Sequence, residues 1–232
     1  MKNVILSGLL LAVFAVVGTG LVAYTFDNTR EQIAANQREA LLRSLHAIIP
    51  PERHDNDLFA DTIQVTDRQL LGSRDPVTVY RARKNGRPVA AALTATAPAG
   101  YGGAIELLVA IRYDGTVAGV RVIDHRETPG LGDGIEIEKS DWISGFDGRS
   151  LEDPPAARWR VKKDGGEFDQ FTGATITPRA VVTAVRNALI YFRTHRRELF
   201  ERQREPAPAL EAPAAGAPAS IPDGDADSPG TD

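Results

Sequence analysis

A run of 21 residues without a charged side chain, VILSGLLLAVFAVVGTGLVAY at positions 4–24, lies near the start of this 232-residue chain. As an α-helix rising ~1.5 Å per residue it would be about 31 Å long, close to the ~30 Å thickness of a bilayer's hydrocarbon core. A cleaved signal peptide is the alternative, because Lys2 begins a short basic segment. The apolar part of such peptides usually spans only about 7–15 residues, however, and LVAY is a poor match to the small-x-small pattern of their cleavage sites. The run therefore predicts a retained transmembrane anchor over residues 1–25.

Charge alone leaves the orientation of this anchor open. Lys2 and the terminal amine favour a cytoplasmic N-terminus, but arginines interleaved with acids follow the span. The positive-inside rule compares lysines and arginines at the two ends of a span, so it does not decide here. The charged residues after the span are Asp27, Arg30, Glu31, Arg38, Glu39 and Arg43.

Residues 26–50 form a predicted linker helix that leads from the membrane into a folded domain. Apolar residues recur there at helical spacing, and Pro50-Pro51 ends the pattern. The apolar positions are Ile33, Leu41, Leu42, Leu45 and Ile48.

Two strand-turn-strand patterns follow the linker. The first, VTVYRARKNGRPVAAALTATA at residues 77–97, brackets Asn85-Gly86. The second, IELLVAIRYDGTVAGVRVIDH at residues 105–125, brackets Asp114-Gly115 in the same way. Asn-Gly and Asp-Gly between alternating apolar residues are strong hairpin signals. Together the patterns predict at least four antiparallel strands.

A long amphipathic helix is predicted over residues 178–204. Thr177 is a suitable N-cap residue and Pro178 suits the first helical position. Apolar residues then recur on one face, which we expect to be buried. These residues are Val181, Val182, Val185, Ala188, Leu189 and Phe192.

The last segment, residues 205–232, contains six prolines, eight alanines and six acids, and no lysine or arginine. Such a composition buries too little apolar surface to offset the entropy lost on ordering, so this acidic tail is predicted to be disordered. Without the tail the chain is close to neutral, and nothing in it indicates a nucleic-acid partner.

The chain has no cysteine, which excludes disulfides, thiolate nucleophiles and cysteine-ligated metal centres. Its four histidines lie far apart in sequence, so no metal site is predicted. The fold class that emerges is α+β: an N-terminal transmembrane helix, then an antiparallel-sheet domain with flanking helices over residues 51–204.

The segment DQFTGAT, Asp169 to Thr175, precedes the predicted helix and has two interpretations. In one it is a loop feeding a helix, with hydroxyls satisfying free N–H groups and Gly173 supplying an unusual backbone angle. In the other, Thr175 lies where a helix N-terminus stabilises a phosphate, while Gly173 and Ala174 leave room for a large ligand. Physical reasoning alone does not name that ligand.

DQFTGAT resembles the flavinylation sequence Asp-x-x-(Ser/Thr)-Gly-Ala-Thr of covalent FMN-binding domains. In that family the last threonine, at the position of Thr175, is joined to FMN through a phosphoester. Residues 101–133, YGGAIELLVAIRYDGTVAGVRVIDHRETPGLGD, also resemble the core of these domains, including a Glu-Thr-Pro-Gly-Leu-Gly loop. Alone, Pro129-Gly130 could belong to any type II turn, but two such motifs in this order, behind a membrane anchor, are specific.

Length, anchor and linker are similar to those of the G subunits of Rnf-type (Rsx) ion-translocating electron transport complexes. The resemblance implies an electron carrier rather than a stand-alone catalyst, with no catalytic residue of its own. It also implies a single-pass protein of the bacterial inner membrane, in contact with lipid, whose FMN domain faces the periplasm. Its partners would be the other subunits of the complex and, during maturation, a flavin transferase that uses FAD and magnesium.

The resemblance further implies which residues bind the cofactor. Thr175 would carry the FMN, and the residues around it would come from both motifs: Thr172, Gly173, Ala174, Glu127, Thr128, Pro129, Gly130, Leu131 and Gly132. A phosphoester leaves the ring's electronics untouched, so its surroundings must tune the potential. Trp142 and the basic run at residues 160–163 are further candidates for contact with the flavin ring. The basic run could equally be a solvated strand edge. His125 is expected to be a structural residue of the loop.

Three alternatives remain. One is a stand-alone FMN-domain regulator or reductase component outside any Rnf complex. The C subunit of the sodium-translocating NADH:quinone reductase shares this domain and anchor. A non-catalytic periplasmic adaptor would share the anchor, hairpins and tail, but would have no reason to carry both motifs.

Overall fold

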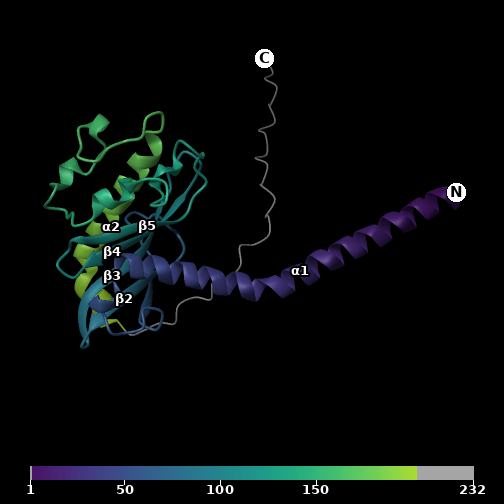
Figure 1. Ribbon diagram of the computed structural model, residues 1–232, viewed down its shortest axis with the longest axis horizontal. Helices are drawn as coiled ribbons and strands as arrows, with labels where there is room; N and C mark the ends of the chain where they lie inside the picture. The colour runs from purple at the N-terminus through teal and green to yellow at the C-terminus, as the bar shows by residue number, and fades with distance from the viewer. Residues whose placement is uncertain (1, 203–232) are drawn as a thin grey trace, which may run out of the picture. The chain divides into compact units, whose positions relative to one another are not determined.

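The computed structural model describes residues 2–202 (Figure 1), and the predicted acidic tail lies outside this range. The chain divides into two compact units, one ending at Gln37 and the other beginning at Arg38. The elements of the second unit produce an α+β fold, as predicted. Its elements, including the end of the first helix, are α1 (Lys2–Ile48), β1 (Thr62–Val65), β2 (Val77–Lys84), β3 (Arg87–Ala97), β4 (Ile105–Arg112), β5 (Val117–Asp124) and α2 (Ile176–Glu201).

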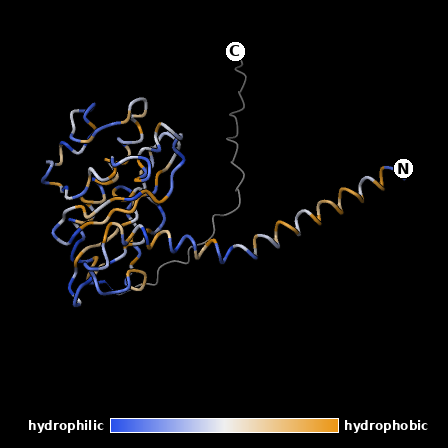
Figure 2. The backbone as a smooth tube through the Cα atoms, viewed as in Figure 1, coloured by the Kyte–Doolittle hydropathy of each residue, from blue (hydrophilic) through white to orange (hydrophobic). Residues whose placement is uncertain are grey.

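Helix α1 is continuous over 47 residues. Its first half is apolar (Figure 2), and the apolar side chains of residues 4–24 are exposed. Among the described residues it is the one helix long and apolar enough to cross a membrane. Where polar residues begin, Thr25 and Thr29 donate their hydroxyl protons to helix carbonyls one turn earlier, so these hydroxyls are satisfied within the helix itself.

The five strands form one antiparallel meander in the order β1-β2-β3-β4-β5. The β2–β3 turn has Asn85 at φ 52° and Gly86 at φ 73°, as a two-residue type I′ turn requires, and confirms the Asn-Gly prediction. At the β4–β5 turn, Asp114 accepts hydrogen bonds from both the N–H and the hydroxyl of Thr116. The short edge strand β1 had not been predicted.

The sheet buries both of its faces, because successive side chains of a strand alternate between them. In β4, Leu107, Val109 and Ile111 join the larger core beneath α2, whereas Leu108 and Ala110 join a smaller core beneath the last turns of α1. The two helices therefore cover opposite faces of the sheet (Figure 1).

The face toward α1 is lined with small residues, which lets the helix approach closely. A Cβ atom on Gly119 would lie 2.6 Å from Cγ2 and 2.9 Å from Cβ of Ile48. Alanines occupy most neighbouring positions of this face: Ala82, Ala90, Ala92 and Ala110.

Helix α2 buries the predicted apolar stripe, with all six positions from Val181 to Phe192 in the core. At its C-terminal end, Arg81 donates hydrogen bonds to the carbonyls of Leu199 (2.9 Å) and Arg202 (2.8 Å), and Arg83 donates one to Phe200 (2.8 Å). Guanidinium groups at this end satisfy carbonyls without a helical partner and oppose the negative end of the helix dipole.

Between β5 and α2 the chain contains no long helix or strand but several 3₁₀ helices, packed around aromatic rings. Phe146 and Phe168 lie 4.7 Å apart between ring centroids, and Trp159 lies 4.9 Å from Phe168. Trp142 and Phe171 extend this cluster at 5.3 Å. The rings replace regular backbone pairing in fixing the path of the segment. The 3₁₀ helices are Asp133–Ile135, Asp141–Phe146, Ala156–Arg158 and Lys162–Asp164.

The Gly119 contact predicts the effect of a single methyl group. Gly119→Ala should destabilise the domain by about 1–3 kcal/mol, because the methyl overlaps Ile48 and α1 must shift. Gly145→Ala is the matched control, since a Cβ there meets no atom within 4 Å. Denaturant unfolding of both variants would check this, and equal stability would contradict the close packing of α1.

Candidate functional site

The two sequence motifs, about 40 residues apart, line the same cavity. Its volume is about 350 Å³. One wall comes from the loop after β5, the other from the segment that enters α2, and the β3–β4 loop adds one residue. The lining residues are Tyr101, Glu127, Thr128, Leu131, Gly132, Gly173, Ala174, Thr175, Ile176 and Thr177.

The Thr-Gly-Ala part of the second motif is a tight turn. Phe171 and Ala174 form an antiparallel bridge, and the Ala174 N–H donates to the Phe171 carbonyl at 3.2 Å. Gly173 has φ +82°, a left-handed conformation that side chains with a Cβ rarely adopt. Thr172 occupies the exposed corner of this turn and does not line the cavity. Of the residues that the resemblance implies for the cofactor, Thr172 is therefore one that the fold does not bring to the cavity.

Thr175 follows the turn and is the residue immediately before α2. Its backbone is already helical (φ −85°, ψ −27°), and its side chain forms no capping hydrogen bond. Its half-buried side chain belongs to the cavity wall. The backbone N–H groups of the first helical turn have no carbonyl partner within the helix, and the helix dipole makes this end positive. The wall thus offers a hydroxyl beside an environment that favours an anion.

The predicted N-cap was wrong. Helix α2 begins at Ile176, so Thr177 lies inside the first turn and Pro178 is its third residue. The Thr177 side chain is fully buried and donates its hydroxyl proton to the Glu127 carboxylate. Because the hydroxyl faces another loop, it cannot fold back onto the N–H groups of its own helix.

The carboxylate of Glu127 connects three segments of the chain. Oε2 accepts the hydrogen bond from Thr177 in α2, and Oε1 accepts one from the Gly102 N–H in the β3–β4 loop at 2.9 Å. The side chain is only 6% exposed. A Cβ on Gly132 would lie 2.5 Å from Oε2, and one on Gly100 would lie 2.7 Å from Oε1. Glycines therefore make room for this carboxylate, which acts through the loops that it holds.

His125 supports Glu127 from the other side. Its Nδ1 accepts a hydrogen bond from the Glu127 N–H at 3.0 Å, so Nε2 carries the proton and donates it to Glu136 at 2.8 Å. Both ring nitrogens are engaged in holding the loop, in accord with the structural role expected from the sequence.

The loop Thr128–Leu131 is a turn with Pro129 and Gly130 at its centre. Gly130 has φ +78°, and the Leu131 N–H donates to the Thr128 carbonyl at 3.1 Å. This geometry is typical of a type II turn, in which the third residue needs a positive φ. Pro129 and Gly130 do not line the cavity, whereas Leu131 does and is 48% exposed.

The other candidates for the cofactor's surroundings lie elsewhere. Trp142 donates its indole N–H to the Asp169 carbonyl at 2.8 Å and packs against Phe171. It therefore stabilises the backbone of the second motif. The basic run at residues 160–163 does not line the cavity either, and Lys162 pairs with Asp169 at 2.7 Å.

An exposed ion pair holds the turn after this run against the first turn of α2. The Arg179 guanidinium donates two hydrogen bonds to the Asp164 carboxylate, at 2.6 and 2.9 Å. The hydrogen bond from Arg179 holds the pKa of Asp164 below its usual value, against a smaller opposing effect of desolvation. Two contacts, one buried at Thr177 and one exposed at Arg179, thus fix the start of α2.

Sequence reasoning had not placed Ile176 and Thr177 at the cavity, although both follow Thr175 directly. A third lining residue, Tyr101, was missed as well. It lies between glycines in the β3–β4 loop, and its side chain is 71% exposed. The sequence signal was an isolated aromatic within Gly-Tyr-Gly-Gly, which carries no periodicity. Over residues 2–202, no group of three or more His, Cys, Asp or Glu side chains could hold a metal ion.

The buried hydrogen bond makes Thr177 important for stability. Thr177→Val keeps the shape but removes the hydroxyl, and leaving the buried carboxylate short of a donor should cost about 1–3 kcal/mol in unfolding free energy. Thr177→Ser should lose less, and Thr172→Val at the exposed corner should be nearly neutral. Chemical denaturation of the three variants tests the order, and a Thr177→Val protein as stable as the wild type would contradict it.

Comparison with known proteins identifies the family. A family model described as FMN-binding domain matches residues 100–190, and one described as RnfG N-terminal region matches residues 1–48. The G subunit of the ion-translocating oxidoreductase complex of Pseudoalteromonas atlantica is 49% identical over 206 residues, covering 88% of this chain and 96% of that relative. The corresponding G subunits of Shewanella baltica (49%, covering 86% and 95%) and Pseudomonas aeruginosa (50%, covering 86% and 93%) are similarly related. The chain therefore belongs to the family of G subunits of ion-translocating oxidoreductase complexes.

Proposed function

We propose that this protein is the membrane-anchored flavoprotein subunit of an Rnf-type ion-translocating complex, and that it carries electrons through an FMN joined to Thr175 by a phosphoester. The observation that carries the proposal is that Thr175 and the Glu127–Gly132 loop line one cavity at the start of a 26-residue helix. An adaptor protein would have no need for this arrangement.

The residues around Thr175 fit an FMN phosphoester. The hydroxyl is not used in capping, so it is available as the attachment atom. The diester formed there would keep a negative charge, which the N–H groups and dipole of the first α2 turn would stabilise. Gly173 and Ala174 present little side-chain bulk on the same wall, and Leu131 and Ile176 supply apolar surface.

Attachment requires a second protein. Thr175 Oγ1 would form a bond to the phosphorus of the FMN half of FAD, the pyrophosphate bond would break, and AMP would leave while the hydroxyl proton passes to solvent or to the transferase. The chain has no glycine-rich nucleotide loop with which to bind FAD itself. A flavin transferase with magnesium therefore supplies this step.

An attached FMN supplies redox chemistry that no side chain of the protein has. The protein's own residues position and surround it. The cavity residues of both motifs would hold the phosphoribityl end, while Glu127 and His125 fix the surrounding loops through hydrogen bonds. The electron donors and acceptors are then other subunits of the complex.

The membrane arrangement follows the division inferred from the sequence. Residues 1–25 would span the inner membrane in contact with lipid, residues 26–50 would link the span to the domain, and residues 51–204 would form the FMN domain in the periplasm. The apolar half of α1 and the match to the N-terminal region of this family support the anchor.

Thr175 can be tested directly by mass. When the protein is expressed with an active flavin transferase, its intact mass should exceed that of the polypeptide by FMN less water. Thr175→Val should abolish the addition, because it removes the attachment oxygen and keeps the branched shape. Thr172→Ser should retain it.

Thr177→Val is a second control, because it removes the hydroxyl that lies two residues from the attachment point in the same wall, and it should retain the mass addition. A Thr175→Val protein that still carried covalent FMN would overturn the assignment. A colourless wild-type protein beside an active transferase would overturn the flavin function itself.

The orientation can be tested by cysteine labelling, since the natural chain contains no cysteine. Arg74→Cys, at a loop position of the domain that is accessible to solvent, should react with a membrane-impermeant maleimide in cells whose outer membrane alone is permeabilised. Lys2→Cys should react only after lysis. The reverse pattern would contradict a periplasmic FMN domain, and release of the protein by carbonate would contradict the anchor.

A further inference from the structure

The mouth of the cavity at Thr175 is apolar and exposed. Outside α1, the described chain exposes five large hydrophobic side chains, and three of them line this cavity: Tyr101 (71% exposed), Leu131 (48%) and Ile176 (46%). Exposed apolar side chains gathered at one cavity indicate a surface that a ligand covers.

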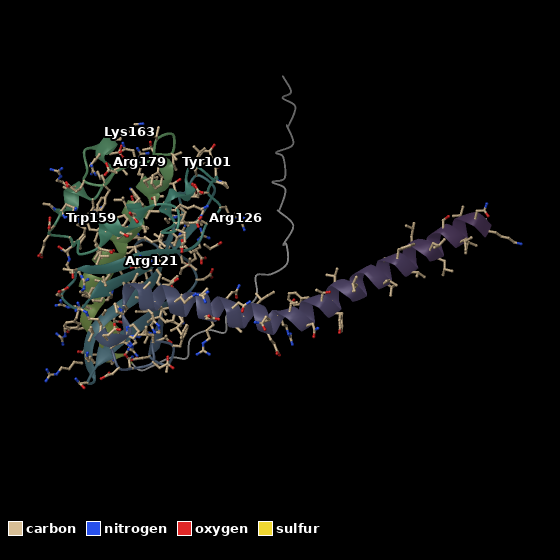
Figure 3. The ribbon with its side chains drawn as sticks, viewed as in Figure 1. Tyr101, Arg121, Arg126, Trp159, Lys163 and Arg179 are labelled. Atoms are coloured by element: carbon tan, nitrogen blue, oxygen red, sulfur yellow. The ribbon has the colours of Figure 1, made fainter. Side chains whose placement is uncertain are left out.

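Tyr101 is the one aromatic among the residues that line this cavity. Its position is not explained by core packing, because most of its ring is in contact with solvent. Figure 3 shows Tyr101 at the outer edge of the domain, at the same side as Arg126.

The backbone that carries Tyr101 is held firmly. The Gly102 N–H donates to the buried Glu127 carboxylate at 2.9 Å. A Cβ on Gly102 would lie 1.8 Å from the Arg126 carbonyl oxygen, so this loop packs directly on the segment leading to Glu127. A large exposed ring on a fixed backbone loses little conformational entropy when it meets a flat ligand.

We propose that Tyr101 stacks on the isoalloxazine ring of the flavin carried by Thr175 and so sets the position of that ring at the cavity mouth. The inference rests on the proposed function, since it needs a flavin at Thr175. The oxidised isoalloxazine is flat and electron-poor, and a phenol is an electron-rich partner for an offset stack. Leu131 and Ile176 border the same mouth with aliphatic surface. The stack favours the oxidised ring over the electron-rich reduced one and therefore lowers the reduction potential.

Optical measurements on the full-length, flavin-loaded protein test the stack. Tyr101→Leu should keep the mass addition of FMN less water, but the equilibrium constant for placing the flavin ring at the cavity mouth should fall roughly 2- to 12-fold, as expected for the loss of one aromatic pair. The visible circular dichroism of the flavin should weaken and its fluorescence should rise, because a stacked phenol quenches flavin emission by electron transfer. Tyr101→Phe should keep the circular dichroism, since the flat ring remains, while fluorescence increases because phenylalanine is a poor electron donor.

Tyr113→Leu is the matched control. Tyr113 is also exposed, at 38%, but its ring packs on Phe200 and Arg196 and does not line the cavity. Its substitution should leave both flavin signals unchanged.

Three results would overturn the stack. The first is a Tyr101→Leu protein with the wild-type dichroism and fluorescence, and the second is a Tyr113→Leu protein in which the two signals change equally. The third is a Tyr101→Leu protein without the mass addition, which would assign Tyr101 to the attachment step. Absence of the addition in the wild-type protein would instead be a failure of the proposed function, and the mass measurement separates the two cases.

Discussion

The buried carboxylate of Glu127 is the constraint on which the site depends. It accepts hydrogen bonds from the β3–β4 loop and from the first turn of α2, and its own backbone N–H is held by His125. Without it, no common hydrogen-bonding group would link the three segments that carry Tyr101, Leu131 and Thr175. A buried carboxylate is costly unless its oxygens are hydrogen-bonded, and each oxygen of Glu127 accepts one such bond. Gly132 leaves the space that this carboxylate occupies, and Gly100 leaves space both for it and for the Gly103 carbonyl oxygen.

Helix α2 is held at both ends by charges that match its dipole. The Glu127 carboxylate lies beside its first turn, and the Arg81 and Arg83 guanidinium groups hydrogen-bond to its last carbonyls. Negative charge near the N-terminus and positive charge near the C-terminus both stabilise a helix. The apolar stripe between the two ends packs on the sheet. These contacts restrict sliding and tilting of α2, and they therefore fix the position of Thr175 at its start. The same sheet holds the last turns of α1 on its other face.

Features encoded by neighbouring residues could be predicted from the sequence, and features made by distant contacts could not. The hairpins followed from Asn85-Gly86 and Asp114-Gly115, because turn geometry depends on the backbone freedom of two residues. The start of α2 was misplaced by two residues because Thr177-Pro178 is a good local cap, and only the fold brings Glu127 to that hydroxyl. Tyr101 was missed because one aromatic between glycines has no pattern. The shared cavity was implied by family resemblance, not by periodicity.

A covalent tether changes what such a cavity has to provide. A freely dissociating cofactor needs a deep pocket whose contacts overcome the loss of its translational freedom. A flavin bonded to Thr175 stays at a high effective concentration beside its site whatever the strength of the contacts. Under the proposed function, the cavity needs only to orient the ring. A shallow apolar mouth with one aromatic on a fixed loop is sufficient for that, and it leaves the ring near the surface, where a partner protein can approach it. Solvent exposure of the site would weaken the binding of a dissociating cofactor, but it suits a tethered flavin that exchanges electrons with a partner.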